Sequence, residues 1–151
     1  MIADFGWTCA NYVYTFVDSF SVSAYHVFER AAPEKKIQLA ASVSLQTEDP
    51  TQEDYDKAVT KIMQSDCLAT VIVTQTAPTA SIIYEARKRG YEGHFVIQAA
   101  SMSIQFNLRR MVGDTQTDEM LHGMLAVAPF NGAGNDRWVF MNLDMSMLAC
   151  E

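Results

Sequence analysis

Apolar positions along the chain follow two spacings, one typical of buried strands and one typical of amphipathic helices. Residues 10–17 and 69–75 are apolar, aromatic or β-branched at nearly every position, which predicts strands buried on both faces. Residues 37–45 alternate apolar with small or polar side chains, so we expect a strand nearer an edge. Residues 94–99 and 123–129 add two short apolar segments. The pattern therefore predicts five strands.

Helical spacing begins directly after the first predicted strand. Apolar residues recur three and four positions apart from Phe20 to Ala31, and Pro33 is expected to interrupt the helix. Asp18 and Ser19 precede this segment and are residue types that cap helices. We therefore expect a helix that starts near Ser19 and stops before Pro33.

A second helix is predicted between the strands at 37–45 and 69–75. Asp49 fits an N-cap, Pro50 fits the first helical position, and acidic residues follow where the helix dipole favours them. Apolar side chains between Tyr55 and Met63 then recur at helical spacing.

The third helix has a legible start and stop. Pro78-Thr79 opens it, basic residues lie in its last turn, and Gly90 stands where a left-handed C-terminal cap is expected. Residues 106–111 predict a short helix or an irregular connection. Strands separated by helices imply right-handed crossovers, so the predicted fold class is α/β, a doubly wound and mainly parallel sheet with helices on both faces.

The chain has 151 residues, enough for one domain. The regular pattern covers residues 1–130, whereas residues 131–151 are first turn-rich and then apolar without clear periodicity. We interpret 131–151 as the start of a crossover to another lobe or as a truncated tail. No apolar segment approaches the roughly 18–20 residues that span a membrane, and no signal-peptide pattern opens the chain.

Charge and cysteine content narrow the possible partners. The net charge of −7, with no basic cluster longer than Arg87–Arg89, argues against nucleic acid and against an anionic membrane surface. Cys9, Cys67 and Cys150 are odd in number and lack metal-ligand spacing, so we expect free or buried thiols instead of a complete disulfide framework.

Candidate ligand contacts follow from a general rule of open parallel sheets. Ligands bind outside the carboxyl ends of the strands, where helix N-termini point. Single Ser, Thr or Asp residues there are more often helix caps, but several such loops at one edge favour a binding site. The rule selects Asp18, Ser19 and Phe20 after the first strand, Thr74, Gln75 and Thr76 after the third, and Gln98, Ser101 and Ser103 after the fourth.

Signatures of catalysis are missing from the sequence. There is no glycine-rich phosphate loop and no nucleophile elbow, and "NGAGN" at 131–135 is better interpreted as a turn. His26, His94 and His122 lie far apart without ligand-spaced partners. Cys67 precedes a strand at the end opposite the expected ligand edge. We therefore expect no catalytic residue, no metal and no cofactor.

The order of motifs resembles the ligand-binding region of type I periplasmic-binding-protein-like receptors, which include branched-chain amino-acid-binding proteins and metabotropic glutamate and GABA-B receptor ectodomains. The resemblance covers residues 2–130 and is strongest in "SIIYEARKRGYEGHFVIQAAS". "NYVYTFVDSFSVSAYHVFERAA" is similar to the start of the second lobe, and "LHGMLAVAPF" to a strand returning to the first lobe.

The resemblance implies one lobe of a two-lobe clamshell that traps a small polar ligand by hinge closure, without catalysis. Its implied partners are the missing first lobe and, in a receptor, a second copy or a membrane-anchored signalling domain. The implied location is the extracellular or periplasmic side of a membrane. The chain departs from the family pattern at Phe20-Ser21, where a Tyr-Gly pair is usual, and at Ser101, where an acidic residue usually pairs with the ligand ammonium. Serine supplies no counter-charge, which argues against an α-amino acid bound in the usual way.

Two alternatives stay open. A degenerate lobe could serve as a dimerisation or scaffolding module without binding a ligand. A nucleotide-binding α/β enzyme domain would require residues 18–21 to hold phosphate without a glycine.

Overall fold

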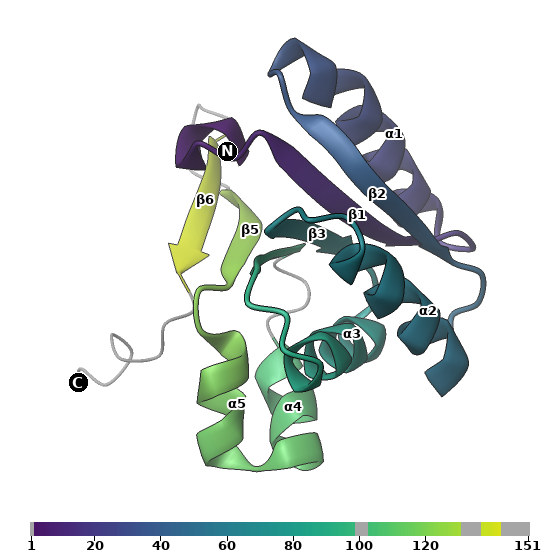
Figure 1. Ribbon diagram of the computed structural model, residues 1–151, viewed down its shortest axis with the longest axis vertical. Coiled ribbons are helices and arrows are strands. Elements are labelled where there is room, and N and C mark those ends of the chain that lie inside the picture. The colour runs from purple at the N-terminus through teal and green to yellow at the C-terminus, as the bar shows by residue number, and fades with distance from the viewer. Residues whose placement is uncertain (1, 99–102, 131–136, 143–151) are drawn as a thin grey trace.

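The protein forms one sheet of parallel strands extended by an antiparallel strand. The computed structural model describes residues 2–98, 103–130 and 137–142. Within these residues the sheet order is β2-β1-β3-β4-β5-β6 (Figure 1). The strands are β1 (Cys9–Thr15), β2 (Gln38–Leu45), β3 (Ala69–Val73), β4 (His94–Gln98), β5 (Leu125–Phe130) and β6 (Arg137–Asn142). Strands β1 to β5 pair in parallel, and β6 pairs antiparallel with β5.

Helices cover both faces of the sheet, but unequally. A 3₁₀ turn, η1 (Ile2–Phe5), precedes β1, and the helices are α1 (Ser19–Glu34), α2 (Gln52–Met63), α3 (Thr76–Lys88), α4 (Ile104–Val112) and α5 (Asp114–Leu121). α1 packs on one face with Tyr12, Val71 and Val96, whereas α2 to α5 pack on the other with Ile72 and Phe95. Consecutive strand residues thus point to opposite faces. The predicted α/β class, with helices on both faces, is confirmed.

The five predicted strands are all present, and three differences concern helix boundaries. α3 begins at Thr76, two residues before the predicted start at Pro78, because proline is tolerated throughout the first turn. α1 continues to Glu34, because Pro33 lies in its last turn, where a missing N–H removes only one helical bond. α2 is capped by Thr51 and not by Asp49. The Thr51 hydroxyl accepts from the Asp54 N–H, and the Asp54 carboxylate accepts from the Thr51 N–H. This reciprocal pair satisfies two donors, which Asp49 could not do from its position.

Three elements were not predicted, and the first is the short 3₁₀ turn η1. α5 buries only Thr117 and Leu121, so its eight residues carry almost no apolar periodicity. β6 lies in the segment interpreted as the start of a crossover or a tail, and it joins the same sheet beside β5. Residues 131–136 and 143–151, which complete that segment, lie outside the described residues.

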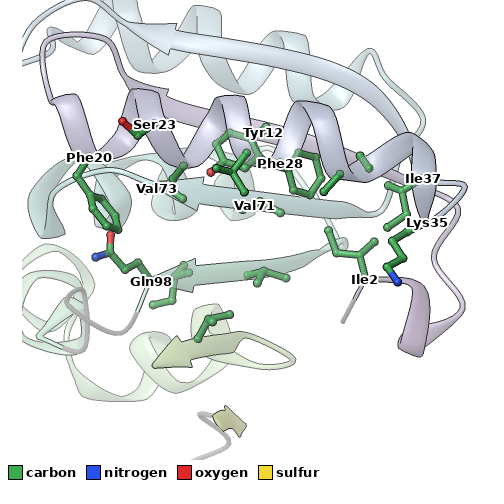
Figure 2. A pocket seen from close by; sticks show the side chains of 17 residues that line it. Ile2, Tyr12, Phe20, Ser23, Phe28, Lys35, Ile37, Val71, Val73 and Gln98 are labelled. Atoms are coloured by element: carbon green, nitrogen blue, oxygen red, sulfur yellow. The ribbon is translucent and has the colours of Figure 1, made fainter. Parts of the chain in front are cut away.

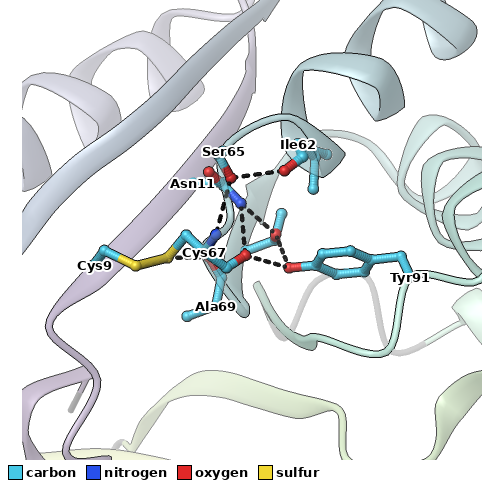
Figure 3. The surroundings of a disulfide bond; sticks show 8 residues. Cys9, Asn11, Ile62, Ser65, Cys67, Ala69 and Tyr91 are labelled. Atoms are coloured by element: carbon cyan, nitrogen blue, oxygen red, sulfur yellow. Dashed lines mark hydrogen bonds between the residues drawn. A yellow bond between two sulfur atoms is a disulfide. The ribbon is translucent and has the colours of Figure 1, made fainter.

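A disulfide joins Cys9 at the start of β1 to Cys67 in the loop before β3 (Figure 3). The expectation of free or buried thiols is therefore wrong for these two cysteines, and Cys150 lies outside the described residues. The pairing follows from topology, because β1 and β3 are neighbours and their starts bring the two Cα atoms to 6.0 Å. A bond at that separation needs no backbone movement.

Candidate functional site

The carboxyl ends of β1, β3 and β4 meet at one edge of the sheet, hereafter the carboxyl edge. The segments that follow β1 and β3 and the last residue of β4 place seven of the nine predicted site residues at this edge, and Ser103 directly precedes α4. Ser101 lies outside the described residues. The opposite edge, hereafter the amino edge, carries the disulfide.

Asp18 serves as the N-cap of α1. Its carboxylate accepts hydrogen bonds from the backbone N–H groups of Phe20 and Ser21, at 3.1 and 3.2 Å, and from the Ser21 hydroxyl. These bonds lower the pKa of Asp18 below its ordinary value, and the bond from the Ser21 hydroxyl has the largest effect. Because the carboxylate already accepts three hydrogen bonds, Asp18 acts mainly as a structural cap. Ser19, the first residue of α1, is exposed beside it.

Thr74 is also committed to local structure. Its side chain is only 5% exposed, and its hydroxyl shares a 2.7 Å hydrogen bond with the hydroxyl of Thr79 in α3. The Thr79 hydroxyl in addition lies 2.8 Å from the carbonyl oxygen of Gln75. This small network ties the end of β3 to the first turn of α3. It leaves the Thr74 hydroxyl facing the protein and not the solvent.

The start of α3 differs from the start of α1 because no side chain caps it. Gln75 occupies the N-cap position with an exposed side chain that makes no cap bond, and Thr76 is half-buried next to it. Among the described residues no acceptor is recorded for the backbone N–H groups of Thr76 and Ala77. Such groups at a helix N-terminus favour the binding of an anionic group.

Gln98 and Phe20 approach each other across the edge. Gln98 ends β4 and is half-buried, while the Phe20 ring is 54% exposed at the start of α1. Figure 2 shows the ring directed towards the Gln98 amide. Ser103 lies further along as the N-cap of α4, exposed and without a side-chain cap bond.

Sequence reasoning missed two apolar residues of this edge. Phe16 and Val17 are 57% and 52% exposed, because β1 ends at Thr15 and both residues lie in the turn before α1. Within the sequence they extend an apolar strand pattern, so they were assigned to the strand interior. Only the end of strand pairing, which the apolar pattern does not mark, turns them outward.

A groove of about 720 Å³ runs from this edge along α1, on the face of the sheet opposite α2 to α5 (Figure 2). Phe20 and Gln98 line its end at the carboxyl edge, and Lys35 and Ile2 line its other end. Valines of β3, β4 and β5 form its floor. The volume is in the range of small-molecule pockets.

Two kinds of chemistry find no support in the described part of the chain. No three His, Cys, Asp or Glu residues lie together there so as to hold a metal ion. Phosphate binding by residues 18–21 is disfavoured, because the Asp18 carboxylate already occupies the amides of Phe20 and Ser21 and would repel an anion.

No helix among the described residues is long and apolar enough to cross a membrane.

Several solved structures share this architecture at low sequence identity. A substrate-binding protein of an ABC transporter from Aeropyrum pernix matches with a TM-score of 0.70 at 13% identity, over 85% of this chain and 32% of that chain. A leucine-binding protein from Thermotoga maritima matches with a TM-score of 0.69 at 18% identity, over 89% and 36%. An extracellular ligand-binding receptor from Rhodopseudomonas palustris matches with a TM-score of 0.66 at 20% identity, over 83% and 32%.

Comparisons by sequence with family models and with curated proteins give no match. The chain spans about a third of the length of the three structures above. The matched part of each structure corresponds to about one lobe. The chain therefore has the fold of a single lobe of a type I periplasmic-binding-protein-like structure.

Proposed function

We propose that this chain is a ligand-binding lobe that forms one wall of a small-molecule site at its carboxyl edge. The observation that carries the proposal is the match to one lobe of solute-binding proteins, in a sheet whose carboxyl edge carries the predicted contact residues. Gln75, Gln98 and the uncapped start of α3 are the polar groups that we assign to the ligand. Phe16 and Phe20 supply exposed apolar surface next to them.

The proposed ligand is a small carboxylate with an apolar body. The open amide groups at the start of α3 suit a carboxylate, and the exposed rings suit an aliphatic group. Asp18 is a poor partner for a ligand ammonium group because three donors already use its carboxylate. We therefore propose that this lobe holds the carboxylate and the apolar part of a leucine-like molecule and that it does not hold the amino group.

Hinge closure against a second lobe is the proposed mode of action. A ligand that contacts both lobes stabilises the closed state by its higher affinity for that state. The disulfide supports an extracellular or periplasmic location, because disulfides persist in oxidising compartments. No catalytic step is part of this proposal.

A scaffold lobe without a ligand is the second candidate. It is favoured by the internal use of polar groups at the edge, since Asp18 caps α1 and Thr74 bonds to Thr79. In that case the exposed Phe16 and Val17 would contact another protein surface. The two candidates differ in whether a small carboxylate binds at all.

Ligand-detected NMR on this chain separates the candidates and tolerates weak binding. We expect leucine and 4-methylpentanoate to bind and leucinamide, which lacks the carboxylate, to bind much less. Gln75→Ala and Gln98→Ala should weaken binding severalfold, while Gln64→Ala, an exposed glutamine at the end of α2, should have no effect. Equal binding of all three compounds would refute the carboxylate assignment. Absence of binding by any of them would favour the scaffold lobe.

A further inference from the structure

The groove along α1 has an apolar floor on a part of the sheet that α1 does not cover. Parallel strands are normally covered on both faces, yet α1 covers the sheet only over β1, β2 and part of β3. The side chains of Val71, Val73, Val96 and Val127 on β3, β4 and β5 form an apolar floor beside it. One stripe of α1, with Phe20 and Val27 more than half exposed, forms the wall. The groove is thus built like a core that lacks one layer.

The length of the groove is set by α1. Phe20 lines one end and Lys35 the other (Figure 2). Lys35, the C-cap of α1, is fifteen positions after Phe20, which corresponds to about 22 Å along the helix axis. An elongated molecule fits such a shape better than a compact one.

A hydroxyl in the groove is available to donate a hydrogen bond. Tyr12 is only 2% exposed, and no hydrogen bond joins its hydroxyl to any other described residue. It lies between α1 and the strands among apolar side chains (Figure 2). Burial raises the pKa of Tyr12 well above its ordinary value, so the hydroxyl stays protonated and can donate. The hydroxyl is therefore a donor that a molecule lying in the groove can use.

A single positive charge marks the end of the groove at the amino edge. Lys35 is the one charged residue among the described side chains that line it. Within that described set, Lys35 makes no ion pair and no carboxylate lines the groove. The groove therefore offers an apolar surface with a cation at one end and a hydroxyl donor along its length.

We propose that this groove binds an elongated amphipathic carboxylate, with the carboxylate at Lys35, the chain against β3 to β5 and an oxygen along the chain accepting from Tyr12. This site shares Phe20 and Gln98 with the proposed leucine-like site, but its charged end, at Lys35, lies at the opposite edge of the sheet. The ligand class is that of a hydroxylated or oxidised fatty acid.

Displacement of a fluorescent octadecanoate from the 151-residue chain tests the proposal. We expect octadecanoate to compete at one equivalent, and octadecyltrimethylammonium, with the same chain but a cationic head, to compete at least tenfold less well. Lys35→Gln should weaken octadecanoate about three- to fivefold. Lys36→Gln, the exposed neighbour that does not line the groove, should leave the affinity unchanged.

A second pair of variants tests the location. Ala31 is exposed and lines the groove, so Ala31→Trp should fill it and abolish binding without unfolding the protein. Arg30→Trp places the same ring on the neighbouring exposed position outside the groove and should not affect binding. The fold of each variant is checked by its thermal unfolding.

The hydroxyl contact is tested by comparing two ligands on the wild-type protein and on a Tyr12 variant. We expect 10-hydroxyoctadecanoate to bind roughly two- to tenfold more tightly than octadecanoate, as one hydrogen bond allows. Tyr12→Phe should remove this preference without lowering the stability of the free protein.

Four results would overturn the proposal. Equal loss of affinity in Lys35→Gln and Lys36→Gln would show non-specific attraction. Unchanged binding in Ala31→Trp, or a hydroxyl preference that survives Tyr12→Phe, would place the compound elsewhere. Failure of every compound to bind, with Ala31→Trp shifting the sedimentation coefficient, would identify a second copy as the occupant.

Discussion

The two edges of the sheet are built in opposite ways. At the amino edge, the disulfide joins Cys9 and Cys67, and the Tyr91 hydroxyl lies 2.8 Å from that of Thr70 and donates to the carbonyl of Cys67 at 3.1 Å (Figure 3). Asn11 donates to the same carbonyl. At the carboxyl edge the aromatic rings are exposed and α3 begins without a side-chain cap. The amino edge thus secures the fold, whereas the carboxyl edge keeps surface available for a partner.

This difference follows a general pattern in proteins, in which some residues stabilise the fold and others bind the ligand. Residues that bind are carried on loops that a rigid scaffold positions, and the scaffold bears the covalent and buried polar links. The comparison predicts that changes at the amino edge will alter mainly the free energy of unfolding. Changes at the carboxyl edge should alter mainly binding.

The largest expected effect is removal of the disulfide. The link closes a loop of 58 residues, so the Cys9→Ser, Cys67→Ser double variant should lose about 4 kcal/mol of unfolding free energy. Denaturant unfolding at neutral pH measures this loss. Reduction of the wild-type chain should lower its stability by a similar amount while leaving the double variant unchanged. A loss below about 1 kcal/mol would contradict the assignment of stability to this edge.

Gly93→Ala should have the next largest effect. A Cβ atom at Gly93 would come within 2.5 Å of the Leu68 carbonyl oxygen and against the Tyr91 ring. Overpacking of this kind costs about 2 kcal/mol. Gly90→Ala is the control, because its φ of 82° brings backbone strain of about 1 kcal/mol, while no atom lies within 4 Å of an added Cβ. Equal losses in the two variants would contradict the tight packing around Gly93.

Asp18 gives a smaller and pH-dependent effect. Loss of the N-cap in Asp18→Ala should cost about 1 kcal/mol at pH 7, whereas Asp18→Asn keeps an acceptor and most of the stability. Because folding lowers the pKa of Asp18, its contribution is fully present above the ordinary carboxyl pKa. It is lost as the pH falls through the lowered value. Urea unfolding between pH 7 and pH 2 should show this loss in the wild type and not in Asp18→Asn.

Exposed apolar residues should affect stability least. Phe16→Ser at the carboxyl edge and Leu68→Ser at the amino edge each replace an apolar side chain that is more than half exposed. Both should change the free energy of unfolding by less than about 0.5 kcal/mol. Only Phe16→Ser should weaken the binding of 4-methylpentanoate in ligand-detected NMR. Equal binding by the two variants would remove Phe16 from the proposed site.

Most of the fold could be predicted from the sequence because its signals are local. β-branched runs and helical spacing identified all five parallel strands and the first three helices, and Gly90 has the left-handed φ expected of a helix stop. α5 was missed because it has too few buried residues to show a helical hydrophobic period. β6 was missed because it forms only by pairing with β5. The disulfide was missed for a related reason. Whether Cys9 and Cys67 can bond depends on which strands are neighbours.

The candidate site was predictable in position but not in detail. The rule for parallel sheets located the carboxyl edge, but it could not tell which polar groups would already be satisfied. Asp18 and Thr74 are used by the protein itself, whereas Gln75 is not engaged in capping. Exposure of Phe16 depends on where strand pairing ends, which the apolar pattern does not mark.

A residue-resolved titration tests the central claim most directly. The ¹H–¹⁵N correlation spectrum of the labelled chain would be recorded with increasing 4-methylpentanoate. We predict saturable shifts of the backbone amides of residues 75–77 and 16–21, with little change around Cys67 and Tyr91. Shifts centred on the amino edge, or no saturable shift at the carboxyl edge, would contradict the proposed division between the two edges.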